Sequence, residues 1–120
     1  MRRTAAIAVN PHGVIGVSWF EQIKGQRPAC QRVMFAASSD GGDTFTAAVP
    51  VSEPFCVDSP GNGGAATRWP GGGEYSGLAA APDGKFHVLW PDARSGIYQL
   101  RHAVVDAKPE PQLTIKPEKP

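Results

Sequence analysis

The chain has 120 residues, with 12 lysines and arginines against 11 aspartates and glutamates, and a formal net charge of +1 at pH 7. This balanced, scattered charge predicts no nucleic-acid partner. No apolar run approaches the roughly 20 residues that a membrane helix requires, so no membrane partner is predicted either.

The first elements along the chain belong to a unit that occurs twice. Residues 6–21 and 77–92 align at the constant offset of 71 that separates Ala8 from Ala79. The other identical pairs are Pro11/Pro82, Gly13/Gly84, Val17/Val88 and Trp19/Trp90. Such a repeat indicates one supersecondary unit used twice, which buries its apolar face by stacking on copies of itself.

Each copy is predicted to contain strand, turn, strand. The turns fall at 10–13 and 81–84, where proline presets φ and glycine stands fourth. The next strands alternate with a period of two, which is typical of half-buried antiparallel strands. Their apolar positions are Ile15, Val17 and Trp19 in the first copy and Phe86, Val88 and Trp90 in the second. The shared position predicts that both tryptophans are core residues, with sugar stacking as the alternative.

A third strand is predicted at 32–37 and 98–105, and a fourth at 45–51 and, more weakly, at 112–115. No stretch shows a helical period. Two sets of four antiparallel strands in a repeating order predict an all-β fold made of two blades of a partial β-propeller.

The predicted organisation is a two-blade segment over residues 1–107, followed by a Pro-, Lys- and Glu-rich tail at 108–120. Blade one covers about 4–52, a long Gly- and Pro-rich loop covers 53–74, and blade two begins at 75. Closed propellers have roughly four to eight blades. We therefore expect the remaining blades in a longer protein, with self-association of copies as the alternative.

One motif points to a family. Residues 38–45 read Ser-Ser-Asp-Gly-Gly-Asp-Thr-Phe and resemble the Asp-box of bacterial sialidase-type (BNR) repeats. Segments 30–38 and 74–94 are similar to the same proteins. The residues that match the motif are Ser38, Asp40, Gly42, Thr44 and Phe45. We expect a structural turn, in which the carboxylate accepts backbone N–H bonds, glycine takes positive φ and the aromatic tucks into the blade. Direct ligand contact is the alternative.

The resemblance implies a sialidase-like glycoside hydrolase fold. Sialidases clamp the substrate carboxylate with three arginines and use a tyrosine nucleophile, a glutamate and an aspartate. Candidate substrate-binding residues here are Arg94, Asp92, Arg68, Trp69 and Tyr75. The alternative for Arg94 and Asp92 is an Asp–Arg pair that holds a loop. For Arg68 and Trp69 it is an ordinary surface loop, and for Tyr75 it is blade packing or a loop anchor.

The Phe/Tyr-Arg-Ile-Pro motif of true sialidases is absent from the sequence, and two blades supply only part of a catalytic set. The resemblance thus favours carbohydrate or cell-surface recognition without a complete active site. Part of an exo-α-sialidase and a non-enzymatic protein-interaction scaffold are the alternatives.

The resemblance also implies an extracellular or periplasmic protein, with any signal peptide expected upstream of this chain. In an oxidising compartment Cys30 and Cys56 are expected to form a disulfide across the blade, with two free thiols as the alternative. The two cysteines and His12, His87 and His102 lack the spacing of a zinc site, so no metal is predicted. No cofactor motif is predicted, because the glycines at 61–66 are not followed by a helical pattern.

Overall fold

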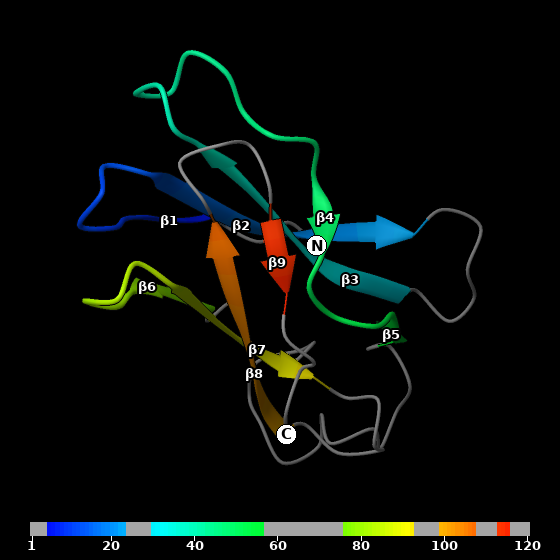
Figure 1. Ribbon diagram of the computed structural model, residues 1–120. Helices are drawn as coiled ribbons and strands as arrows, with labels where there is room; N and C mark the ends of the chain where they lie inside the picture. Colours follow the sequence, from blue (N-terminus) through cyan, green and yellow to red (C-terminus); the bar gives the residue numbers. More distant parts are fainter. Residues whose placement is uncertain (1–4, 24–29, 57–75, 93–98, 108–112, 116–120) are drawn as a thin grey trace.

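The computed structural model (Figure 1) describes residues 5–23, 30–56, 76–92, 99–107 and 113–115. These residues form strands and turns and no helix, which confirms the all-β class. In this part of the chain there is accordingly no helix that is long and apolar enough to cross a membrane.

The described strands form two antiparallel sheets. The first sheet has the order β1-β2-β3-β4, with β5 also paired to β3. Its strands are β1 (Ala6–Val9), β2 (Ile15–Ile23), β3 (Cys30–Ser38), β4 (Val49–Pro50) and β5 (Phe55–Cys56). The second sheet has the order β6-β7-β8-β9. Its strands are β6 (Gly77–Ala80), β7 (Phe86–Asp92), β8 (Gln99–Ala107) and β9 (Leu113–Ile115).

The turns that join the first two strands of each sheet have the same geometry. Gly13 and Gly84 have φ angles of 79° and 89°. Each donates its N–H to the carbonyl three residues earlier, at Asn10 over 3.0 Å and at Ala81 over 2.9 Å. Glycine adopts this left-handed conformation at no steric cost, because it has no Cβ. The predicted turns at 10–13 and 81–84 are therefore confirmed.

The fourth strand of the first sheet is shorter than the predicted 45–51 and is followed by β5, whose residues were predicted as loop. Pro50 and Pro54 have no N–H to donate, so a continuous ladder along β3 cannot form. Between β4 and β5, the Ser52 hydroxyl accepts a hydrogen bond from the Val33 N–H at 2.8 Å. A side chain thus replaces the missing backbone partner where the strand bends.

The two sheets pack face to face around a single core. The rings of Phe35 on β3 and Phe86 on β7 lie 5.4 Å apart, centroid to centroid. Gly16 on β2 leaves the space that the Phe86 ring fills, since a Cβ there would stand 2.7 Å from Phe86 Cε1. The buried core residues are Val14, Val33, Phe35, Ala37, Val51, Phe55, Phe86, Val88, Trp90, Ala103, Val105 and Ala107.

The two equivalent turns also contact each other. The amide nitrogen of Asn10, a buried residue, donates a hydrogen bond to the carbonyl oxygen of Gly84 at 2.8 Å. The ring of His12 lies against the same glycine, 2.8 Å from the position that a Cβ would take. In Figure 1 the β1–β2 and β6–β7 turns accordingly extend in the same direction from the two sheets. This contact joins the two sheets at their turns.

The prediction that both repeat tryptophans are core residues is correct for one of them. Trp90 is completely buried, whereas Trp19 is only half-buried. The sheets stack the same way round, so equivalent side chains face the same direction. Trp90 points toward the first sheet, and Trp19 points away from the second, onto the face of the first sheet that no second-sheet strand covers.

Candidate functional site

The Asp-box sequence forms a turn that is held by its own side chains. The Ser38 hydroxyl donates to Asp40 Oδ1 at 2.8 Å and accepts the N–H of Gly42 at 2.9 Å. Asp40 Oδ1 also accepts the Thr44 N–H at 2.9 Å, and Asp40 Oδ2 accepts the Thr44 hydroxyl. Gly41 and Gly42 have φ angles of 75° and 98°. The turn therefore has the hydrogen bonds and the positive φ that the motif predicts.

These bonds change the chemistry of Asp40. Hydrogen bonds from the Thr44 hydroxyl, the Thr44 N–H and the Ser38 hydroxyl, in that order, lower the pKa of Asp40 from 3.8 to about 2. A carboxylate that is ionised and already accepts three hydrogen bonds is suited to holding a turn. The arrangement fits the structural role that the motif predicts for Asp40.

Phe45 does not follow the expectation. Its side chain is 49% exposed, whereas the motif predicts that the aromatic tucks into the sheet. The next residue explains the difference. Thr46 donates its N–H to the Ala37 carbonyl at 2.8 Å, and its hydroxyl accepts the Ala37 N–H at 3.1 Å. Because successive side chains in an extended segment point to opposite sides, this inward turn of Thr46 directs Phe45 to solvent.

Asp92, a predicted substrate-binding residue, lies in the core. It is 0% exposed, and its Oδ2 accepts the indole N–H of Trp90 at 2.9 Å. Arg101 Nε lies 3.8 Å from the same oxygen. A group without exposed surface cannot touch a substrate, so the binding role predicted for Asp92 is wrong. Its carboxylate neutralises Arg101 and holds the Trp90 ring.

The acidic position has an equivalent in the first sheet. Glu21 aligns with Asp92 at the repeat offset, and its Oε1 accepts hydrogen bonds from Arg32 Nε at 3.0 Å and Nη2 at 2.8 Å. Both side chains of this pair are partly exposed, at 41% and 37%. Sequence reasoning missed Arg32 and Arg101. Their contacts depend on the strand register, which pairs Glu21 with Arg32 and Trp90 with Arg101 and which the structure supplies.

A histidine pair lies on the second sheet, on the face that points away from the first. His87 Nδ1 and His102 Nε2 are 2.8 Å apart, and the two rings stack at an interplanar angle of 6°. Two imidazoles can form such a hydrogen bond when the nitrogen of one ring donates its N–H and the nitrogen of the other accepts it. Among the residues that the structure describes, no group of three or more His, Cys, Asp or Glu side chains could hold a metal ion.

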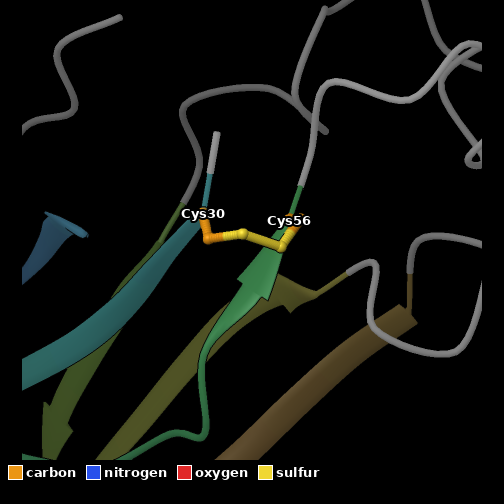
Figure 2. The surroundings of a disulfide bond; sticks show 2 residues. All are labelled: Cys30 and Cys56. Atoms are coloured by element: carbon orange, nitrogen blue, oxygen red, sulfur yellow. A yellow bond between two sulfur atoms is a disulfide. The ribbon is translucent and has the colours of Figure 1, made fainter. Parts of the chain in front are cut away.

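The structure contains the disulfide between Cys30 and Cys56 (Figure 2). The two residues are direct cross-strand partners, at the start of β3 and the end of β5. Figure 2 shows the bond running between the two strands at the edge of the sheet. β5 brings Cys56 back alongside Cys30, so the short strand that the sequence did not predict is what aligns the two sulfur atoms.

Four of the predicted substrate-binding residues, Arg68, Trp69, Tyr75 and Arg94, lie outside the described residues. Among the other predicted site residues, the structure joins Ser38, Asp40 and Thr44 of the Asp-box to one another by hydrogen bonds. It separately joins Cys30 to Cys56. Comparisons with protein-family models, with curated proteins and with solved structures found no match.

Proposed function

We propose that the chain forms two blades of a sialidase-like β-propeller that recognises carbohydrate, as free glycan or on a cell surface. The observation that carries the proposal is the Asp-box turn, in which the Asp40 carboxylate binds both the N–H and the hydroxyl of Thr44. The turn lies between β3 and β4, where the motif belongs in the resembled family. The stacking of two repeat-equivalent sheets supports the propeller part of the proposal.

Recognition is favoured over hydrolysis by the state of the arginines. Sialidase chemistry needs arginines that are free to clamp a carboxylate. The arginines in the described ranges are Arg32 and Arg101, and each faces a carboxylate of its own sheet, Glu21 or Asp92. Neither is available to a substrate in this arrangement. Catalysis in a sialidase thus needs groups from outside the described ranges, and we retain exo-α-sialidase only as the alternative.

The test is a glycan-binding screen of the purified chain together with a hydrolysis assay. Immobilised glycans with and without terminal sialic acid serve as probes, and a fluorogenic sialoside reports cleavage. We expect glycan retention without release of the fluorophore. We also expect Arg94→Ala or Trp69→Ala to weaken retention at least about tenfold, which corresponds to about 1.4 kcal/mol. Gln22→Ala, at an exposed position on β2, is the matched control that should leave retention unchanged.

Two results would overturn the proposal. Release of the fluorophore by the wild-type chain would establish the enzyme alternative. Failure to retain any glycan, with circular dichroism showing folded β structure, would instead favour a protein-interaction scaffold.

A further inference from the structure

The face of the first sheet that points away from the second carries a group of apolar side chains on β1 and β2. The apolar side chains that β1 and β2 place on this side, here named the leading face, are Ile7, Val9, Ile15, Val17 and Trp19. On the same side, Met34 and Ala36 of β3 are buried, and Glu21 and Arg32 form an ion pair beyond Trp19. Ile7 pairs with Val17 and Val9 with Ile15, so these residues of β1 and β2 share one face. Ile7 is 68% exposed and Val9 is 59% exposed. Neighbouring large apolar groups in water are a feature that folded chains usually cover.

The equivalent face of the second sheet is covered. At the repeat offset of 71, the five residues of the leading face correspond to Leu78, Ala80, Phe86, Val88 and Trp90. The last three are buried at 0–1% exposure against the first sheet, and the other two pack on the same core. In the second sheet, therefore, the residues equivalent to the leading face bind a neighbouring sheet. The leading face has the same pattern of positions.

The opposite end of the molecule carries the complementary pattern. The outer face of the second sheet, here named the trailing face, contains His87, Leu89, Pro91, Leu100 and His102. Strand register makes Leu100 equivalent to Val33 and His102 equivalent to Phe35, and both equivalents lie in the core between the sheets. Leu100 is 64% exposed. The trailing face thus consists of residues equivalent to those of the first sheet that pack against the second sheet.

Side-chain size at the centre of the two contacts changes in opposite directions on the two faces. Inside the chain, the large Phe86 fits over Gly16, which has no side chain. On the trailing face His87 takes the position of Gly16, and on the leading face the smaller Ile15 takes the position of Phe86. The larger group at His87 is thus met by a smaller group at Ile15, and the increase from Gly to His exceeds the decrease from Phe to Ile.

We propose that the leading face of one chain binds the trailing face of a second copy, in the way that the second sheet binds the first within one chain. Such a head-to-tail contact uses two different patches, so it continues into a ring or an open chain of copies. The turn-to-turn hydrogen bond of Asn10 is not repeated in this contact, because Ala81 stands at the equivalent position. The contact consequently pairs the apolar side chains of the leading face with Leu89, Leu100 and the His87–His102 pair of the trailing face. It does not depend on the carbohydrate recognition proposed above.

The experiment measures the mass of the 120-residue chain by sedimentation velocity and light scattering over a concentration series. Ile7→Glu places a charge on the leading face and Leu100→Glu places one on the trailing face. Both side chains are largely exposed in the single chain, so each variant should keep the β-sheet circular dichroism of the wild type. Ala47→Glu, at an exposed position of the β3–β4 connection, is the control.

We expect the wild type and Ala47→Glu to form species larger than a dimer and each face variant alone to be monomeric. An equimolar mixture of the two face variants should form a dimer and nothing larger, since only one intact pair of faces remains. A monomeric wild type at its highest soluble concentration would overturn the proposal. So would dimers of Leu100→Glu alone, because these indicate two leading faces in contact. A variant that loses its β-sheet signal is replaced by Val9→Glu on the leading face or Leu89→Glu on the trailing face, with the same expectations.

Discussion

The ring of Phe86 occupies the space in which a side chain at Gly16 would lie. A Cβ at Gly16 would stand 2.7 Å from Phe86 Cε1 and 2.9 Å from the Phe35 ring. Backbone of one sheet and side chain of the other thus meet without a gap. The close approach of the two sheets depends on a glycine that the repeat does not conserve, since His87 stands at its equivalent position.

Gly16→Ala is expected to destabilise the protein by about 1–3 kcal/mol, because an overpacked core must move side chains or backbone. The measurement is equilibrium unfolding in urea. Gly77→Ala is the matched control, because its Cβ would meet Leu89 at an ordinary 3.8 Å. We expect Phe86→Leu to recover part of the loss in the Gly16→Ala background. Equal stability of the two alanine variants would contradict this account of the interface.

The two equivalent acidic residues are expected to differ in importance. Asp92→Ala leaves Arg101 without its counter-ion and the buried Trp90 indole N–H without its acceptor, which costs about 3–5 kcal/mol for a buried charge pair. Glu21→Ala removes a partly exposed ion pair and should cost about 0–1 kcal/mol. Urea unfolding of both variants at neutral pH tests the difference. Similar losses of unfolding free energy for the two variants would show that burial does not decide how much each carboxylate contributes to stability.

The Asp-box turn should give stability a dependence on acid pH. The pKa of Asp40 is about 2 in the folded chain and 3.8 as its ordinary value, so folding favours the ionised form. The resulting stabilisation is complete above about pH 4 and is lost as the pH falls through about 2. Asp40→Asn should therefore unfold more easily at neutral pH and lose less stability between pH 4 and 2 than the wild type. Asp43→Asn, at an exposed neighbouring position, is the control. Parallel pH profiles for Asp40→Asn and wild type would contradict the prediction.

Reduction of the disulfide is expected to destabilise the chain by about 3.5 kcal/mol, the loop-closure value for residues 26 apart in sequence. Urea unfolding with and without reductant measures the loss. The double variant Cys30→Ala, Cys56→Ala should be insensitive to reductant. Titration of two free thiols in the unreduced, unfolded protein would instead establish the free-thiol alternative.

The sequence alone determined most strands, the equivalent turns at 10–13 and 81–84, and the hydrogen bonding of the Asp-box turn. All of these depend on local rules: alternation of apolar residues, proline and glycine at fixed turn positions, and a short polar side chain that bonds backbone four residues away. The interrupted fourth strand is the exception. It depends on how β4, which ends at Pro50, and β5 pair with β3, and pairing with a distant strand is not a local property.

Tertiary structure alone decided which of two equivalent residues became core. Trp19 and Trp90 occupy the same position of the repeat, and so do Glu21 and Asp92. One member of each pair is buried because the first sheet covers it, and the other is more exposed because no second-sheet strand covers its face. A repeat shows which positions are equivalent. Burial depends on the neighbour that each copy meets, and only the stacking of the two sheets supplies that neighbour.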